Sequence, residues 1–414
     1  MKKSMVIMTA VLIGILSMGN VQAQAQGDVS DVLDSVDIHG FISQGYLQSD
    51  DNNYLANDTE DGTFQFNEFG INFATQLTDE LRLGLQLFAR DLGDLGNDEI
   101  ELDWAFADYR WRDWAGLRVG KIKMPVGLYN EFRDIDALRT SILLPQSVYA
   151  DSLRDVYIAL EGVGIYGHIP CDSMGRLSYQ VQWGTSNIDD EGGAAKNVER
   201  MAMGAIEAKS FDVSDGYVGS LQWHTPLQGL RIGGSLVTVD FKVDAAMTAA
   251  LGPIPRGTLL TFDAEDLTIY ALSAEYAVGD LLVAVEYSRV DIDIEAPDIL
   301  AGIIPIELSK ESEGYYASAS YRFTDWFKLG AYYSIYYADV DDRDGDDLEQ
   351  LGLPDHRAWL KDLALSTRFD INDYWIFKLE GHLMDGTATV SMPENPNDAE
   401  EDWFLFAAKL TFTF

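Results

Sequence analysis

The side chains that most often carry out catalysis or bind metals are few in this sequence. The chain has five histidines, namely His39, His168, His224, His356 and His382. None lies in the Gly-x-Ser-x-Gly pattern of a hydrolase nucleophile or the paired-histidine pattern of a zinc helix. Cys171 is the single cysteine, so no internal disulfide can form. The acidic run 339–347 lacks the regular spacing and the final glutamate of a calcium-binding loop. We therefore predict no catalytic residue, no metal site, no cofactor and no enzyme activity.

Charged side chains of both signs gather in one long stretch of the sequence, 124–155. Its candidate residues are Glu131, Arg133, Asp134, Asp136, Arg139 and Arg154. Opposed acidic and basic groups across a narrow passage produce a transverse field that orients dipolar solutes, and rings of charge set selectivity in pores. The same groups can instead pair with each other and hold the stretch against a neighbouring surface. Both interpretations stay open, and both can hold together.

Sixteen segments have the alternation and the flanking turn residues of β-strands, which would position these charges. They lie near 37–47, 63–77, 81–91, 101–112, 116–124, 156–168, 176–185, 216–225, 229–242, 264–277, 280–292, 313–323, 326–340, 357–370, 373–387 and 402–414. Single-chain bacterial barrels have an even number of strands, and sixteen strands enclose a water-filled lumen. We therefore predict an all-β fold, a transmembrane antiparallel up-and-down β-barrel of about 16 strands over 37–414.

The connections between these segments alternate between short and long, as in a barrel with turns on one side of a membrane and loops on the other. A soluble sandwich has no reason to alternate in this way. Within a segment, successive residues face opposite sides, so Phe404 and Phe406 share one face of the last segment and Lys409 lies on the other. The polar faces are predicted to line the lumen. The wall residues selected on these faces are Arg82, Arg322, Lys328, Arg368, Lys378 and Glu380.

The N-terminal part of the chain carries a signal of export. An apolar run over 5–18 is followed by small residues at Ala23 and Ala25. The run is shorter than the roughly 20 apolar residues of a membrane helix, so we interpret it as part of a secretory signal peptide. We predict a signal peptide over 1–23, with cleavage after Ala23 or Ala25, and a short N-terminal segment over 24–36.

Aromatic residues favour a membrane location. All nine tryptophans lie near the ends of the proposed strands, and amphipathic rings prefer the headgroup level, so we predict two aromatic girdles. The chain ends on Phe414 inside an alternating strand, which resembles the terminal signature of Gram-negative outer-membrane barrels.

One local motif makes the resemblance more specific. The run Gly120-Lys-Ile-Lys-Met-Pro-Val-Gly-Leu128 resembles the Gly-x-x-Lys-x-Pro-x-Gly-Leu stretch of porins in the phosphate-selective and related branches. In the wider superfamily of 16-stranded Gram-negative porins, the fifth strand leads into a long loop that folds back into the lumen and narrows it. The resemblance therefore implies that the connection 124–155, the longest in the chain, is such a constriction loop. It also implies a homotrimer.

The overall charge is strongly acidic, with 29 basic and 68 acidic residues and a formal net charge of −39. The carboxylates concentrate in the long connections. An acidic mouth raises the local concentration of cations, although a solvated loop surface with no transport role explains the same pattern. We see no basic cluster rich enough to assign phosphate selectivity, and no basic patch for nucleic acid.

Two functions fit these observations. We expect a porin of the bacterial outer membrane that gives passive diffusion of small hydrophilic solutes or ions, with lipid and lipopolysaccharide around it. The alternative is a non-conducting barrel that acts as a receptor, adhesin or structural protein through its acidic external loops.

Overall fold

The computed structural model describes residues 35–56, 58–300, 307–395 and 399–414. The predicted signal peptide over 1–23 lies outside the described residues, as does most of the segment over 24–36. In the described part of the chain, no helix is both long and apolar enough to cross a membrane.

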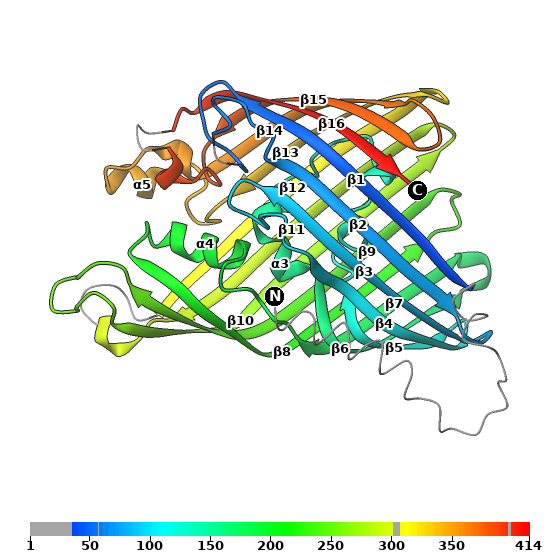
Figure 1. Cartoon of the computed structure of the whole chain (residues 1–414), viewed down its shortest axis with the longest axis horizontal. Helices are drawn as coiled ribbons and strands as arrows, with labels where there is room; N and C mark the ends of the chain where they lie inside the picture. Colours follow the sequence, from blue (N-terminus) through cyan, green and yellow to red (C-terminus); the bar gives the residue numbers. More distant parts are fainter. Residues whose placement is uncertain (1–34, 57, 301–306, 396–398) are drawn as a thin grey trace. The chain divides into compact units, whose positions relative to one another are not determined.

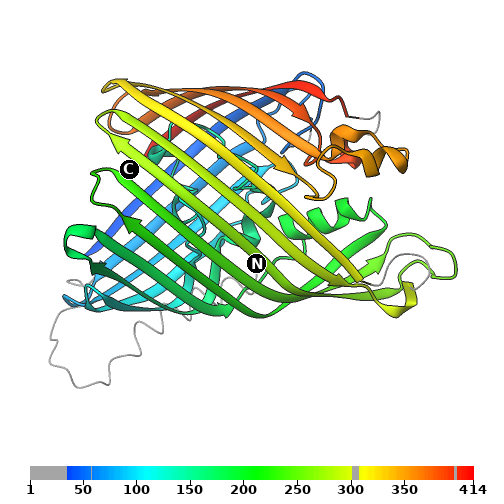
Figure 2. The same cartoon turned by 180° about the vertical axis from the view of Figure 1, so that it is seen from behind.

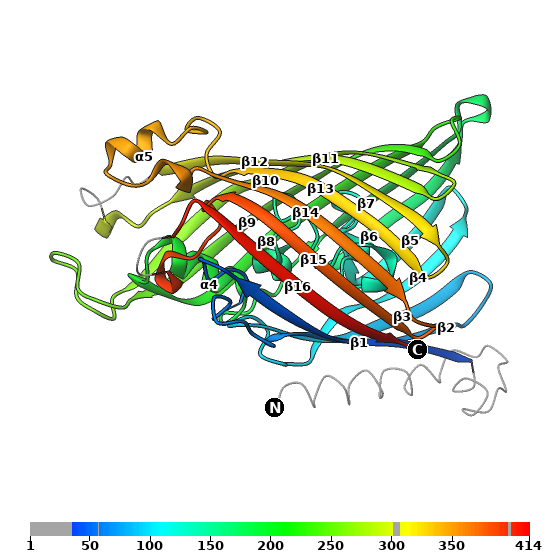
Figure 3. The ribbon, with the colours of Figure 1, turned by 90° about the horizontal axis from the view of Figure 1, so that it is seen from above.

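The described residues form sixteen strands that close into one antiparallel barrel (Figures 1 and 2). The strands are β1 (Val36–Ser49), β2 (Phe66–Gln76), β3 (Leu81–Leu92), β4 (Glu101–Arg112), β5 (Ala115–Lys123), β6 (Ala159–Pro170), β7 (Arg176–Thr185), β8 (Ile206–His224), β9 (Leu230–Met247), β10 (Leu259–Val278), β11 (Leu281–Glu295), β12 (Glu307–Thr324), β13 (Phe327–Tyr337), β14 (Trp359–Asp370), β15 (Trp375–Gly386) and β16 (Asp402–Thr413). Each strand pairs with its neighbours in the sequence, and β1 closes the barrel against β16 (Figure 3). The prediction of a sixteen-stranded up-and-down barrel is confirmed.

The helices of the described residues are short and lie in the connections between strands. They are η1 (Asn130–Phe132), η2 (Asp136–Leu138), η3 (Asp151–Leu153), α3 (Arg154–Tyr157), η4 (Asp172–Met174), α4 (Gly193–Met201), η5 (Asp298–Leu300), α5 (Asp346–Gln350), η6 (Asp355–Arg357) and η7 (Met392–Glu394).

The outer face of the barrel is apolar and exposed. In β16, Phe404 and Leu410 are exposed whereas Lys409 is buried, which is the reverse of a soluble protein. Apolar side chains that are 40% or more exposed within the strands include Leu117, Val119, Val163, Ile165, Val181, Leu221, Ile232, Leu236, Leu272, Val285, Leu363, Leu365 and Leu383. Soluble monomers rarely expose so much contiguous apolar surface. A closed barrel satisfies its backbone hydrogen bonds internally, and with this apolar exterior it is suited to span a lipid bilayer.

Several strands on one side of the barrel are longer than predicted. The alternation placed the start of β8 near 216, whereas it begins at Ile206, and β10 begins at Leu259 rather than near 264. Register shifts interrupt β8 between Ala208 and Ser210 and again between Val213 and Asp215. Each bulge breaks the period of two on which the sequence analysis relied, so an acidic stretch of strand was taken for a loop.

The girdle prediction is wrong for Trp403. This side chain is only 4% exposed, its Nε1 donates to the carbonyl of Gly386 at 3.1 Å, and its ring packs edge-on against Tyr54. Trp403 lies on the inward face of β16, one residue from the outward-facing Phe404, and fills the interior beneath the 50–65 connection.

Candidate functional site

The connection between β5 and β6 is the longest between the described strands and covers residues 124–158. It is three residues longer than the predicted 124–155, because residues 154–157 form helix α3 and β6 begins only at Ala159. We call it the 124–158 segment. The wall of the barrel is a single layer of strands, and its outer face is exposed. Strand residues that are buried against this segment therefore lie on the inner face of the wall.

Asp136 is one of the most deeply buried residues of the segment. Lys378 of β15 donates to its carbonyl and to its Oδ1, both at 2.8 Å, and Thr411 of β16 donates to its Oδ2 at 2.8 Å. Lys378 and Asp136 are 0% and 1% exposed. Burial opposes ionisation of the carboxyl, but Lys378 and Lys409 more than compensate and hold the pKa of Asp136 below its usual range. This buried ion pair fixes helix η2 against β15 and β16.

Glu380 holds the next part of the segment by its backbone. Its two carboxylate oxygens accept from the amides of Ile142 at 2.8 Å and Leu143 at 2.9 Å. His382 lies 3.2 Å from one of these oxygens, and Ser366 donates to the other at 2.5 Å. A carboxylate that accepts backbone amides is a strong, charge-assisted anchor.

Glu286 of β11 makes a comparable anchor that the sequence analysis missed. It accepts from the amide of Leu128 at 2.8 Å and from the hydroxyls of Tyr149 and Tyr316 at 2.5 and 2.6 Å. The available signal was the position of Glu286, an inward-facing glutamate directly after the apolar run from Leu281 to Val285. Glu286 and Glu380 therefore attach the segment to strands on different parts of the wall.

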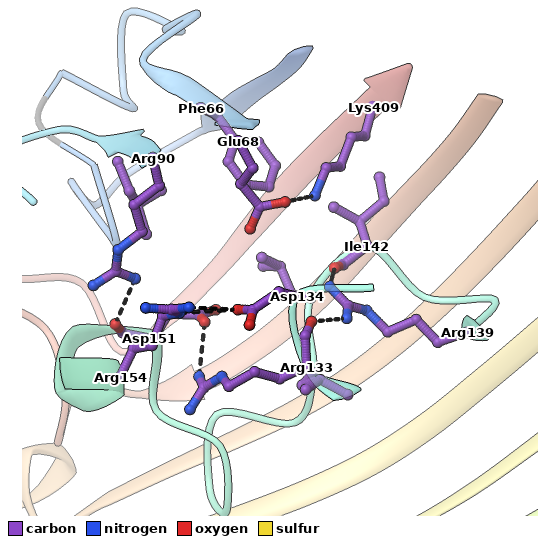
Figure 4. A pocket seen from close by; sticks show the side chains of 13 residues that line it. Phe66, Glu68, Arg90, Arg133, Asp134, Arg139, Ile142, Asp151, Arg154 and Lys409 are labelled. Carbon is purple, nitrogen blue, oxygen red and sulfur yellow. Dashed lines mark hydrogen bonds and ion pairs between the residues drawn. The ribbon is translucent and has the colours of Figure 1, made fainter. Parts of the chain in front are cut away.

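A network of buried charges attaches the far end of the segment to β4. Arg154 donates to Asp103 at 2.6 Å and to Asp134 at 2.9 Å, and its guanidinium lies 4.1 Å from the ring centre of Phe88. Lys123 donates to Asp134 at 2.6 Å. Figure 4 shows Arg154 and Asp134 beside a small cavity that several other arginines line. Asp103 was also missed, because it sits where the β3–β4 register shifts.

Connections from opposite parts of the strand order meet above this site. In the 186–205 connection, Arg200 of α4 forms an ion pair with Glu394 of the 387–401 connection. The amide of Gly193 donates to Asp155 of the 124–158 segment at 2.7 Å. Asn395 in turn donates to the carbonyl of Asn53 at 3.0 Å. These contacts link the connections β1–β2, β5–β6, β7–β8 and β15–β16 to one another.

The comparisons with known proteins agree with this architecture. No family model and no curated protein matches the sequence. Among solved structures, OmpT of Vibrio cholerae has 13% identity and a TM-score of 0.55 over 92% of this chain and 97% of that one. Salmonella typhi OmpF, solved with daunomycin, has the same four values. The anion-selective porin from Comamonas acidovorans has 14% identity and a TM-score of 0.54 over 92% and 99%.

This chain has the fold of outer-membrane porins. Identities this low establish the fold alone. The closed barrel and its apolar exterior place the protein in a bacterial outer membrane, as predicted.

The porin fold brings together three of the six predicted wall residues. Lys378 and Glu380 bind the segment as described, and Arg368 donates to the carbonyls of Ala137 and Arg139. The other three lie nearer the short connections. Arg322 pairs with Asp280 at 2.8 Å, Lys328 lies 3.5 Å from Asp370, and Arg82 is exposed next to Asp108 in the strand register.

The predicted charges of the segment all have partners. Arg133 donates to Asp151 at 2.9 Å, Arg139 donates to the carbonyls of Arg133 and Ile142, and Glu131 accepts from Gln180 at 3.1 Å. Of the two interpretations left open by the sequence, mutual pairing that holds the stretch against the wall is the one these contacts support.

Proposed function

We propose that this protein is a porin, through which small hydrophilic solutes or ions diffuse passively across the outer membrane. The 124–158 segment narrows the lumen and sets the size of what passes. The observation that carries this proposal is the set of contacts between the segment and inward-facing residues of β11, β14, β15 and β16. Contacts with several parts of the inner wall support a position of the segment inside the barrel.

The anchors suit a fixed constriction. Burying an ion pair such as Lys378–Asp136 is costly unless the geometry is good and the remaining donors are satisfied, and here the ammonium has three acceptors. Such an arrangement specifies one position of the segment. Passive transport needs this kind of permanent shape and no catalytic group, and we propose no enzymatic role.

The alternative of a receptor, adhesin or structural barrel acting through acidic loops gains no support from the contacts at the mouth. Polar groups at the mouth pair with one another, as in Asn53–Asn395 and Arg200–Glu394. These pairs join the connections 50–65, 186–205 and 387–401. A homotrimer stays a prediction from the resemblance, and lipopolysaccharide as a neighbour of the barrel stays a prediction.

Single-channel recording in a planar bilayer tests the proposal. The refolded mature protein should give discrete, stable current steps in KCl. Neutral polymers of graded size, added to the bath, should enter the channel only up to a limiting diameter. That limit should be smaller than the diameter that an unobstructed sixteen-stranded barrel would admit. Folded, heat-modifiable protein that gives no current would refute the proposal. Current with no size cut-off would refute the constriction.

A further inference from the structure

Seven basic side chains follow one another around the wall at the end where the short connections lie. Each of the strands β3 to β9 contributes one of them, in the order Arg82, Arg110, Arg118, His168, Arg176, His224 and Arg231. We call this set the basic arc. Because its members come from seven strands, they are far apart in the sequence and form no visible basic cluster there.

The alternation of the strands places the arc on the inner face. In β7, Gln182 is 2% exposed and donates to Lys123, so it points inward, and Arg176 lies six residues away on the same face. In β8, His224 lies six residues from Val218, which is 1% exposed. The β7–β8 and β8–β9 registers show no shift in these stretches.

The register also brings the arc members close to each other. Arg176 lies directly opposite His224, and His224 directly opposite Arg231, on three adjacent strands. Adjacent strands are about 4.8 Å apart, so these side chains form a continuous row. His168 of β6 contacts Ser178 of β7 at 2.9 Å through Nδ1 and so continues the row on its other side.

The arc holds more positive than negative charge. Two carboxylates pair with members of the arc, namely Asp108, which binds Arg118 at 3.0 Å, and Glu275, which binds Arg231 at 2.9 Å. A third, Asp113, lies close enough to His168 to act on its charge. Glu131 of the 124–158 segment faces the same region through Gln180. Three arginines, Arg82, Arg110 and Arg176, make no side-chain hydrogen bond or ion pair within the described residues. These three keep their guanidinium groups available to a solute.

We propose that the basic arc is a binding site for small solutes that carry two or more oxyanion groups, such as tricarboxylates or polyphosphates. Guanidinium groups bind carboxylate and phosphate oxygens in pairs, and a concave low-dielectric wall concentrates anions near charges of one sign. The acidic external connections repel the same solutes, so the arc is reached most readily from the side of the short connections. This use of the lumen rests on the proposed function, but binding itself does not require current.

Titration calorimetry of the detergent-solubilised barrel with citrate, and separately with tripolyphosphate, tests the proposal directly. The triple variant Arg82→Gln, Arg110→Gln, Arg176→Gln removes the three available cations and leaves no ion pair broken. It should bind the anions about tenfold more weakly or worse. The control variant, Arg256→Gln with Lys310→Gln, removes one exposed cation from the connection between β9 and β10 and one from β12, and it should bind as the parent protein does. Equal affinity of parent and triple variant for both anions would overturn the proposal. Binding of one anion alone would identify which oxyanion the site takes.

Bilayer recording separates this proposal from the porin proposal. Citrate added on the side of the short connections should reduce the KCl current at lower concentration than citrate added on the other side, and the triple variant should lose that difference. Loss of anion binding in the triple variant of a barrel that carries no current would uphold the arc while refuting the porin. Current that citrate leaves unchanged, in a barrel that calorimetry finds inert, would refute the arc alone.

Discussion

Two sets of basic residues on the inner wall use their charges in opposite ways. On the β14–β16 side, Arg368, Lys378 and Lys409 are 0 to 6% exposed. The charged groups of all three donate to carbonyl or carboxylate oxygens. On the β3–β9 side, Arg82 and Arg176 are exposed and make no ion pair within the described residues.

This difference shows how one type of residue serves structure or binding according to its burial. A charge taken out of water must find partners inside the protein and then resists any change in their position. A charge left in water keeps its donors free for a solute. The basic residues of the stretch 124–155 belong to the first kind, and the three unpaired arginines of the basic arc belong to the second.

The largest effect is expected from breaking the buried side. Lys378→Met would leave Asp136 with the hydroxyl of Thr411 and the more distant Lys409, whose Nζ is 3.7 Å from its Oδ1. Removing one partner of a buried pair costs about 3–5 kcal/mol. We expect a lower midpoint for thermal unfolding in detergent and faster hydrogen exchange at the amides of residues 136–143. Lys328→Met, at a partly exposed pair with Asp370, is the control and should change neither value appreciably. An equal response of both variants would contradict the contrast between buried and wet charges.

Acid should weaken the same side more gradually. The pKa values of Asp134, Asp136 and Asp151 are lowered because neighbouring cations outweigh burial. Groups with lowered folded pKa values stabilise the fold fully above their unfolded pKa, about 4 for aspartate, and lose that contribution as the pH falls below it. Current noise from the open channel should therefore stay constant between about pH 8 and pH 5 and rise below about pH 4. The Asp136→Asn variant should show higher noise at neutral pH and a smaller rise in acid. A rise in current noise that begins near neutral pH would show that groups other than these aspartates cause it.

The smallest effect concerns the ion pair between Arg200 and Glu394 at the mouth. Its side chains are 24% and 20% exposed, and such pairs contribute about 1 kcal/mol or less. Arg200→Gln should leave thermal stability unchanged but increase brief current fluctuations at low salt, and the increase should vanish near 1 M KCl because salt screens the pair. Lys209→Gln, which removes an exposed pair within β8, serves as the control. Fluctuations that persist at high salt would rule out an electrostatic origin.

The barrel could be predicted from the sequence because its signal is local. Alternation with a period of two gives each strand by itself, as in Trp375 to Leu383, and the lengths of the connections add the topology. Where bulges interrupt the period, as in β8, the same reasoning loses ten residues of strand.

The functional residues were less predictable because they are assembled across strands. Glu380 and Lys378 were found as polar residues on an alternating strand, but their partners in the segment depend on how the segment folds. Glu286 was missed since an isolated inward carboxylate carries no motif, and Asp103 because it lies at a register shift. The basic arc was missed as a set, although Arg82 was predicted, because its members come from seven different strands. A search for one inward basic residue beside each short connection would have found it.

The seam between β1 and β16 has a consequence for the order of events during biogenesis. The partner of the first strand is the last one, so residues 41–49 stay without their hydrogen-bonded neighbour until residues 405–413 have been delivered. Until then two strand edges are open, and open edges are sites where other chains attach. The incomplete barrel is therefore the form most exposed to aggregation, and loss of β16 would leave the whole cylinder open instead of shortening it by one strand.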